Sequence, residues 1–206
     1  MEDVRLGLRE LKKRQTRDSI AAAALKLTEE KGLSDVTLEE IAREAFVSPR
    51  TISNYFSSKE EAVLAAGTIA TEQVLEDFSS SPSEVPPLEA LCVLMSSYAR
   101  EHPDRLRKSA RMVALEESNP SLRPIRLAQE VELVIDLSGR IATRTGTDLT
   151  VDVYPSMVAS AAVSAMVTSL TLWYLAGFPE DRLPKLVEDS FNLASAGYPR
   201  RTAEPA

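Results

Sequence analysis

The sequence predicts an all-α protein, and two observations support this fold class. Apolar residues recur at helical spacing, for example at i, i+3, i+4 and i+7 over residues 20–27. No segment alternates apolar and polar residues over the length of a strand, so no sheet is expected. Helix-start and helix-stop residues further divide the chain into an N-terminal group of short helices and a longer helical remainder.

The first two helices are marked by their ends. An Ala-rich helix is expected from Lys13 to Lys31, and Gly32 follows it at the position where many helices end. Thr37 and Glu40 then form the pattern of a capping box, in which the side chain of each residue bonds to the backbone N–H of the other. The second helix therefore begins after Thr37.

Two helix starts lie only ten residues apart in the segment SPRTISNYFSSKEE, residues 48–61. Ser48 precedes Pro49, a residue favoured in the first turn, and so begins a third helix. Ser58 begins a fourth helix, which is expected to continue to about Phe78. The third helix is therefore very short. The N–H groups at the start of the fourth helix, which Ser57 and Ser58 open, are expected to attract a phosphate.

Two short helices joined by a tight turn, the second tipped with polar side chains, are typical of a helix-turn-helix. The second helix of this motif enters the major groove of DNA, where its N-terminal residues meet base edges. Ile52 and Phe56 would hold the helix on its scaffold. The residues left to face outward are Arg50, Thr51, Ser53 and Asn54. Arginine pairs with guanine, and asparagine pairs with adenine. A surface turn in a helical bundle has the same spacing, so the spacing alone leaves both interpretations open.

A linker rich in helix breakers, SSSPSEVPP at residues 79–87, separates this region from further helices. The helices expected beyond it span residues 88–100, 104–117, 119–145, 152–176 and 183–196. We therefore expect two domains, a helix-turn-helix domain with a basic N-terminal arm at residues 1–58 and a larger helical domain at residues 59–200.

Charge is unevenly distributed along the chain. The net charge is −7, but residues 1–60 hold 11 basic and 11 acidic side chains, so the excess of acid lies beyond them. Between Arg5 and Arg17, six basic residues, Arg14 among them, accompany the single acidic residue Glu10. Salt screens the interaction between charges over about 8–10 Å. The acidic side chains elsewhere in the chain therefore do not prevent this segment from binding phosphates. Two interpretations of the arm are open, entry into the minor groove or a solvated, disordered tail.

Composition disfavours several kinds of site. The chain has one cysteine, Cys92, and one histidine, His102, too few for an intrachain disulfide, a Cys- or His-based metal site or a His-dependent triad. We therefore expect no metal and no cofactor. The charged N-terminus predicts no signal peptide, and hence a cytoplasmic location. Residues 157–175 carry no charge, but their hydroxyl groups favour a buried helix over a membrane span.

The stretch Lys13–Leu64, KRQTRDSIAAAALKLTEEKGLSDVTLEEIAREAFVSPRTISNYFSSKEEAVL, resembles the DNA-binding domain of the TetR family of bacterial transcriptional regulators. The matching features are an Ala-rich first helix, Lys31-Gly32, Thr37 before Glu40-Ile41-Ala42, Val47-Ser48, Thr51, Tyr55-Phe56 and Lys59-Glu60. The resemblance implies an all-α homodimer that reads a palindromic operator in double-stranded DNA with its N-terminal domain. It also implies that the C-terminal domain binds an effector and dimerises.

The resemblance implies that Thr37, which caps the second helix, contacts a DNA phosphate. It implies the same for the side chains of Tyr55 and Lys59. Ser53 departs from the family pattern, because many members have an aromatic residue there. The expected DNA-binding residues are Thr37, Ser48, Pro49, Arg50, Thr51, Asn54, Tyr55, Lys59 and Arg14.

An effector pocket is expected to be mostly apolar. Its candidate residues are Met95, Tyr98, Met112, Leu115, Met157, Met166, Trp173 and Tyr174. Ordinary core packing is the alternative for each of them.

A dimer interface is expected where a stripe of small residues meets the last helix, with packing inside one chain as the alternative. The residues are Ser156, Ser160, Ser164 and Thr168 on the stripe, and Leu183, Leu186, Val187 and Phe191 on the last helix.

These expectations describe a ligand-responsive transcriptional regulator, a repressor released from its operator by a small hydrophobic effector. Activation of transcription and a helical adaptor with no DNA role are the alternatives. A helical enzyme is disfavoured, because the residues at hand assemble neither a nucleophile with a base nor a set of metal ligands.

Overall fold

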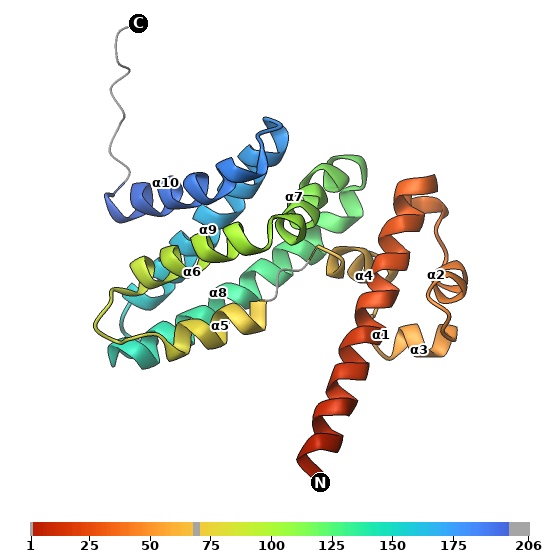
Figure 1. Cartoon of the computed structure of the whole chain (residues 1–206), viewed down its shortest axis with the longest axis horizontal. Helices are drawn as coiled ribbons and strands as arrows, with labels where there is room; N and C mark the ends of the chain where they lie inside the picture. Colours follow the sequence, from red (N-terminus) through yellow and green to blue (C-terminus); the bar gives the residue numbers. More distant parts are fainter. Residues whose placement is uncertain (1, 68–70, 198–206) are drawn as a thin grey trace, which may run out of the picture. The chain divides into compact units, whose positions relative to one another are not determined.

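The computed structural model describes residues 2–67 and 71–197, apart from the side chains of residues 2–8, 10, 71, 72, 113 and 114. Every regular element in these ranges is a helix and no strand occurs in them, which confirms the all-α prediction (Figure 1). The chain forms two compact units. Unit 1 comprises Met1–Thr68 and Met112–Arg126, and unit 2 comprises Ile69–Arg111 and Leu127–Ala206.

Unit 1 is built around a small core of aliphatic side chains. Its elements are α1 (Glu2–Lys31), η1 (Leu33–Asp35), α2 (Leu38–Glu44), α3 (Pro49–Ser53), α4 (Lys59–Ala65), the last part of α7 (Pro103–Ser118), η2 (Pro120–Leu122) and the first residues of α8 (Arg123–Thr145). Each of the first four α-helices contributes a completely buried residue, namely Ile20, Ile41, Ile52 and Val63. The short helices are therefore stabilised by packing in a common core, because helices of this length are not stable alone.

The compact units differ in extent from the division expected at residues 58 and 59. Helix α4 belongs to unit 1, because Val63 packs in the same core as Ile20. The hairpin between α7 and α8 also belongs to unit 1, since Met112 and Leu122 are buried in that core. The buried Glu116 forms an ion pair with Arg126 across this hairpin.

Helix α1 is longer than the sequence predicted. It begins at Glu2 rather than at Lys13, so the backbone of the basic segment is helical and is neither an extended arm nor a disordered tail. An α-helix with its side chains is about 10–12 Å wide, whereas the minor groove is about 6 Å wide. Of the two interpretations left open by the sequence, the disordered tail does not match this helical backbone, and the minor groove is narrower than such a helix. The side chain of Arg5 lies outside the described residues.

The fourth expected helix, from Ser58 to Phe78, is wrong as a single element. Helix α4 ends at Ala65, and α5 (Thr71–Ser80) begins after a break. The Ala66 and Gly67 N–H groups bond to carbonyls only three residues back, at 3.1 and 3.0 Å, which tightens and ends the helix. Glycine also disfavours helix by about 1 kcal/mol relative to alanine. Residues 68–70 lie outside the described residues.

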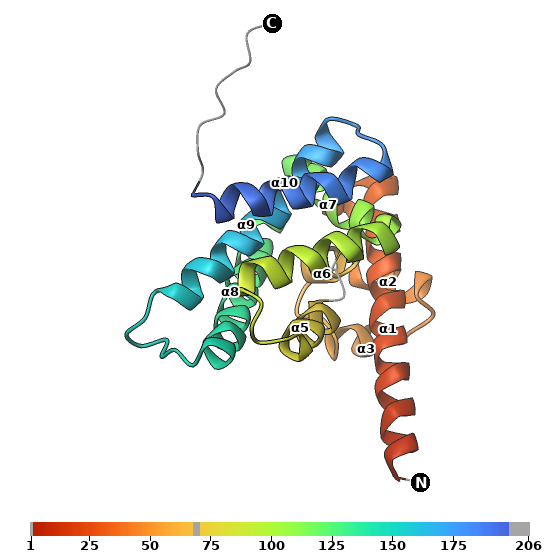
Figure 2. The ribbon, with the colours of Figure 1, turned by 60° about the vertical axis from the view of Figure 1, so that its left-hand side comes forward.

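Unit 2 consists of longer helices, whose bounds agree with the sequence predictions within one or two residues except at α5 and α8. Its elements are α5, α6 (Pro87–Glu101), the first part of α7, most of α8, α9 (Tyr154–Leu175), η3 (Glu180–Arg182) and α10 (Leu183–Ser195). Helix α8 was expected to start at Asn119, but the 3₁₀ turn η2 precedes it. Helix α10 packs against both α6 and α9 (Figure 2).

Arg144 on α8 fixes the end of α5 and the linker that follows it. Its Nη1 donates to the carbonyl oxygens of Phe78 and Ser81, both at 3.2 Å, and its Nη2 donates to that of Val85 at 2.8 Å. The guanidinium also lies 5.0 Å from the centre of the Phe78 ring. The breaker-rich linker is thus held by side-chain contacts although it has no regular structure.

Helix α9 is long and apolar enough to cross a membrane by length and composition alone. Its inner face packs in the core of unit 2, where Trp173 is almost completely buried. The buried Ser169 hydroxyl donates to Ala165 O at 2.7 Å and lies 2.9 Å from Ser190 Oγ on α10. Packing inside unit 2 accounts for the apolar residues on this inner face, whereas Met157, Leu172 and Leu175 are exposed, so the helix is less buried than the sequence predicted.

Candidate nucleic-acid interface

Helices α2 and α3 form the expected helix-turn-helix. A tight turn connects them, in which the Val47 N–H donates to Ala42 O at 2.9 Å. Ile52 is completely buried and Phe56 is 4% exposed. The guanidinium of Arg17 on α1 lies 5.2 Å from the centre of the Phe56 ring. The two anchors predicted from the sequence therefore fix α3 on the core of unit 1.

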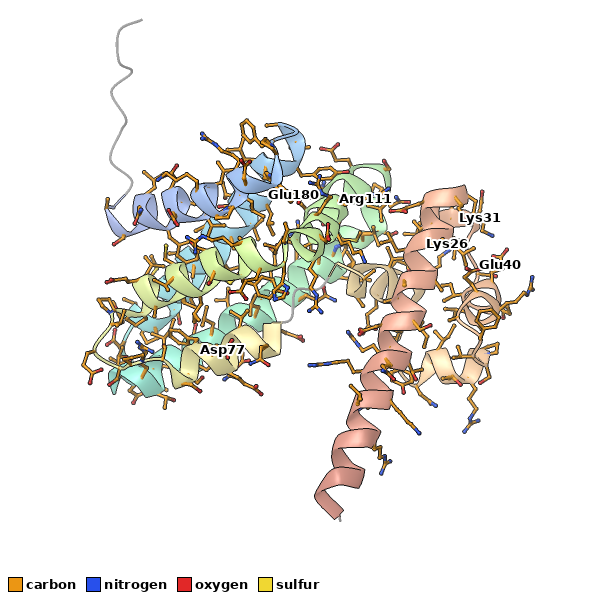
Figure 3. All side chains as sticks on the ribbon, viewed as in Figure 1. Lys26, Lys31, Glu40, Asp77, Arg111 and Glu180 are labelled. Atoms are coloured by element: carbon orange, nitrogen blue, oxygen red, sulfur yellow. The ribbon has the colours of Figure 1, made fainter. Side chains whose placement is uncertain are left out.

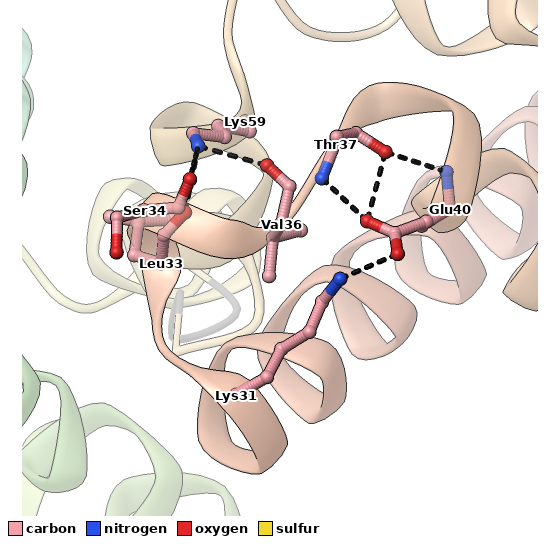
Figure 4. A network of polar contacts seen from close by, with 7 residues as sticks. All are labelled: Lys31, Leu33, Ser34, Val36, Thr37, Glu40 and Lys59. Carbon is pink, nitrogen blue, oxygen red and sulfur yellow. Dashed lines mark hydrogen bonds and ion pairs between the residues drawn. The ribbon is translucent and has the colours of Figure 1, made fainter.

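The start of α2 is capped as the sequence predicted (Figure 4). The Glu40 N–H donates to Thr37 Oγ1 at 3.3 Å, and the Thr37 N–H donates to Glu40 Oε2 at 2.9 Å. Lys31 on α1 adds an ion pair to Glu40 Oε1 at 2.5 Å, so the two side chains point toward one another (Figure 3). The Lys31 ammonium, together with the bonds from Thr37, lowers the pKa of Glu40 to about 2.

The start of α3 is capped by Ser48, whose Oγ accepts from the Thr51 N–H at 3.1 Å. The two side-chain oxygens of these residues also lie 2.8 Å apart and share a hydrogen bond. Arg50 is exposed, and its guanidinium has no hydrogen bond or ion pair with any described residue. Arg50 is therefore the cation that α3 presents to solvent at its N-terminal end.

The remaining residues of α3 differ in how freely they face solvent. Ser53 turns back along its own helix and donates to Pro49 O at 3.4 Å. Asn54 is exposed at the C-cap position, and Tyr55 is half-buried against the core of unit 1. The donor of the Ser53 hydroxyl is thus directed to its own helix, while Asn54 keeps its side chain exposed.

Lys59 has a different environment from the one expected for a phosphate clamp. Its ammonium donates to three backbone carbonyls at the end of η1, those of Leu33 at 2.7 Å, Ser34 at 3.2 Å and Val36 at 2.9 Å (Figure 4). An ammonium group has three N–H donors, and all three are engaged. Lys59 therefore ties the first residue of α4 to the segment between α1 and α2.

The N-terminus of α4 is also less open than expected. The Ser57 N–H and hydroxyl both donate to Glu61 Oε2 at 2.7 Å, and Ser58 Oγ accepts from the Glu61 N–H at 3.1 Å. Glu61 therefore occupies part of the site at which a phosphate was expected to meet backbone N–H groups.

Sequence reasoning missed two exposed residues beside α3. Arg43, in the last turn of α2, is exposed, and Phe46 in the turn is 96% exposed with a φ of 57°. Phe46 lies in the turn between α2 and α3. Its left-handed backbone was not foreseen, because bulky residues seldom adopt it.

The residues expected to line an effector pocket are divided between the two units. Met112 and Leu115 pack in the core of unit 1, and Met157 is 65% exposed. The other candidates lie in or against the core of unit 2, namely Met95, Tyr98, Met166, Trp173 and Tyr174. Apolar composition could not indicate which of the two cores each residue joins.

The expected dimer surface also needs correction. Leu183, Val187 and Phe191 on α10 are buried inside unit 2, because α10 packs against α6 and α9. Ser160, Ser164 and Thr168 on α9 instead line an open groove of about 450 Å³ between α8 and α9. Apolar residues of α8 line the other side of this groove, namely Leu127, Val131, Val134 and Ile135.

Among the described residues, no group of three or more His, Cys, Asp or Glu side chains could hold a metal ion. Cys92 is half-buried, and this burial raises the pKa of its thiol. A thiol kept protonated is a poor nucleophile.

A helix-turn-helix on a compact helical unit, followed by a second all-helical unit, is an arrangement typical of DNA-binding transcriptional regulators. Residues 20–66 match the family model of bacterial regulatory proteins of the tetR family, and residues 85–199 match the MftR C-terminal domain. The chain is also 33% identical over 181 residues to the HTH-type transcriptional regulator TcmR of Streptomyces glaucescens, a match that covers 82% of this chain and 77% of TcmR. The chain belongs to the TetR family, whose members are transcriptional regulators and not enzymes.

Solved structures of TetR-family regulators share the fold. A putative regulator from Syntrophomonas wolfei has a TM-score of 0.61 and 21% identity, with 90% of this chain and 97% of that chain covered. FadR from Thermus thermophilus, solved in complex with lauroyl-CoA, has a TM-score of 0.56 and 24% identity, with 92% and 99% covered. These likenesses support the all-helical architecture and its N-terminal helix-turn-helix.

The lowered pKa of Glu40 predicts a pH-dependent contribution to stability. A carboxyl group whose folded pKa is about 2, below its ordinary 4.5, stabilises the fold above about pH 4.5 and loses that contribution as the pH falls toward 2. Glu40→Gln keeps a side chain suited to the capping box but removes the charge. Urea unfolding from pH 7 to 2 should show a shallower loss of stability for this variant. Glu39→Gln, one residue away, is the control, and equal slopes for Glu40→Gln and wild type would contradict the assignment.

Lys59→Met tests the bonds to the carbonyls of η1. Leaving three carbonyls without their shared donor should lower the free energy of unfolding by about 1–3 kcal/mol. If the ammonium does not contact phosphate, the slope of log K against log salt for DNA should stay as in wild type. A slope that is flatter by about 1 in the variant would show that Lys59 contacts a phosphate, as the sequence predicted. Lys26→Met, which breaks an exposed ion pair to Glu44 on α2, is the matched control.

Proposed function

We propose that this chain is a ligand-responsive repressor that binds a palindromic operator as a homodimer and is released by a small hydrophobic effector. It acts in the cytoplasm, where its DNA lies. The observation that carries the proposal is the exposed Arg50 near the start of α3, a helix that Ser48 caps and that Ile52 and Phe56 anchor in the core. An anchored short helix with a free cation near its N-terminal end suits the major groove.

Each expected DNA contact has a role in this proposal. Arg50 pairs with guanine and Asn54 with adenine in the major groove. The contacts with phosphates come from the start of α2, the start of α3, the end of α3 and the exposed face of α1. The residues concerned are Thr37, Ser48, Pro49, Thr51, Tyr55 and Arg14. Lys59 contributes by holding the loop before α2 in place.

Dimerisation follows from the small size of the reading helix. A helix of five residues contacts only a few base pairs, too few to select one site in a genome. A second copy doubles the site and imposes two-fold symmetry on it. The groove between α8 and α9 supports this role, because exposed apolar residues of α8, such as Val131 at 58% and Ile135 at 65%, face the small residues of α9.

Effector binding is proposed for unit 2. TetR-family regulators bind small-molecule effectors, and the Thermus FadR structure holds lauroyl-CoA, a ligand with an apolar chain. Met95, Met166 and Trp173 already pack together in the core of unit 2, so an apolar ligand would have to displace part of that packing. Methionine side chains adapt readily to such a change.

We expect helix α7 to couple effector binding in unit 2 to DNA binding by unit 1. Helix α7 starts in unit 2, and its end contributes Met112 to the core of unit 1. An effector that prefers a different position of α7 would therefore alter the core that supports α3. It would lower DNA affinity by the difference between its affinities for the two states.

Arg50→Ala tests the reading helix. Loss of a bidentate pair with guanine should cost about 1–3 kcal/mol per half-site and relax the preference for one base. The probe is DNA selected from a randomised duplex pool by the wild-type protein, and binding is measured by fluorescence anisotropy. Arg105→Ala removes an exposed arginine of unit 2 and should leave affinity unchanged. Wild-type affinity and base preference in Arg50→Ala would refute this role, and a wild-type protein that enriches no sequence would refute the proposed function.

Ser164→Arg tests the dimer surface. A long charged side chain in the groove between α8 and α9 should separate the subunits and abolish operator binding, although α3 is unchanged. Thr143→Arg, at an exposed position of α8 outside the groove, is the control and should remain a dimer. Light scattering at micromolar concentration gives the mass directly. A wild-type mass near that of one 22.6 kDa chain would contradict the dimer, and an unchanged dimer in Ser164→Arg would contradict this surface.

A further inference from the structure

Phe46 combines two unusual properties in the turn between α2 and α3. Its φ is 57°, and it is the one non-glycine residue with a positive φ among those that the structure describes. Its side chain is 96% exposed, more than any other large apolar side chain in the described part of the chain. Neither property is common for phenylalanine, and the two occur here together.

The fold itself gains little from this side chain. A bulky residue in the left-handed region is strained, whereas glycine or asparagine adopts that conformation readily. An exposed ring contributes no hydrophobic stabilisation, because it is not removed from water. The turn is held by backbone bonds on both sides, from the Phe46 N–H to Arg43 O at 3.3 Å and from the Val47 N–H to Ala42 O at 2.9 Å. Glycine or asparagine at this position would serve the fold at least as well.

The surroundings of the ring are suited to DNA. Phe46 lies two residues before Ser48, the cap of α3, and hence at the entrance to the proposed reading site. Arg43 and Arg50 are exposed on the helices before and after it, and neither guanidinium pairs with any described side chain. Along the chain, an exposed apolar side chain thus stands between two exposed, unpaired cations. Such a combination suits a duplex edge, where phosphates flank the carbons of deoxyribose and the methyl groups of thymine.

We propose that Phe46 is a DNA-contacting residue whose ring packs on apolar atoms at the edge of the major groove, either deoxyribose carbons or a thymine C5-methyl group. This inference rests on the proposed function. The contact would stabilise the complex by removing the ring from water, and it would add no charge interaction.

The test uses the full-length protein and duplex DNA selected by the wild-type chain from a randomised pool. Phe46→Asn and Phe46→Gly should melt at or above the wild-type temperature, because both residues accept the left-handed backbone. Their affinity for the selected DNA should fall about five- to twentyfold, the effect of losing a partly buried aromatic side chain. The slope of log K against log salt should not change, since no phosphate contact is lost.

Two controls make the loss specific to the ring. Phe46→Tyr keeps an aromatic side chain at the same strained position and should retain affinity within about twofold. Val151→Asn removes another highly exposed apolar side chain, 83% exposed in the loop between α8 and α9, and should leave affinity unchanged.

A DNA substitution separates the two sources of apolar contact. Replacing thymines one at a time with uracil removes a single methyl group each. If the ring meets a methyl group, one replacement will weaken wild-type binding but not that of Phe46→Asn. If the ring meets deoxyribose, no replacement will matter, and Phe46→Asn will still bind more weakly.

Two results would overturn the inference. The first is wild-type affinity in both Phe46→Asn and Phe46→Gly. The second is an equal loss in Phe46→Tyr, which would show that the ring itself is not the contact. If the wild-type protein selects a DNA sequence, either result contradicts only the role of Phe46. If the wild-type protein selects no sequence, the proposed function itself is contradicted.

Discussion

Burial of Ile52 and Phe56 in the core of unit 1 is the interaction on which the DNA-reading surface depends. Helix α3 has five residues, and a helix of that length does not persist alone, because nucleation costs more than one turn of hydrogen bonds returns. Its position is fixed by these two anchors and by the Ser48 cap. The direction in which Arg50 points is therefore a property of the packed unit.

The rest of unit 1 supports those anchors through contacts distant in sequence. Lys59 bonds three carbonyls that lie 23 to 26 residues earlier, and Lys31 reaches the capping glutamate of α2. Met112 and Leu122 arrive from α7 and η2 to complete the core. A small domain that buries limited apolar area gains from such polar ties. They also connect the reading helix to a segment whose remainder belongs to unit 2.

Local signals made most of the fold predictable. The Thr37–Glu40 capping box, the Ser48 cap and the Ser58 cap each depend on residues within four positions, so short stretches were sufficient to place α2, α3 and the start of α4. Features set by tertiary structure were not predictable. The three carbonyls that hold Lys59, the left-handed backbone of Phe46 and the burial of Met112 in unit 1 all require partners that the sequence does not place. The sequence showed the small-residue stripe that includes Ser164, which lines the groove between α8 and α9. It did not show that the apolar face of α10 packs inside unit 2, because periodicity identifies an apolar face but not the partner that covers it.

Hydrogen–deuterium exchange with and without the selected duplex tests the central claim most directly, because it reports where DNA contacts the backbone. Operator binding should slow exchange in peptides that cover residues 37–59, with the largest effect at the capped starts of α2 and α3, which the proposal places against phosphates. Slower exchange confined to other segments, with residues 37–59 unchanged, would contradict the account.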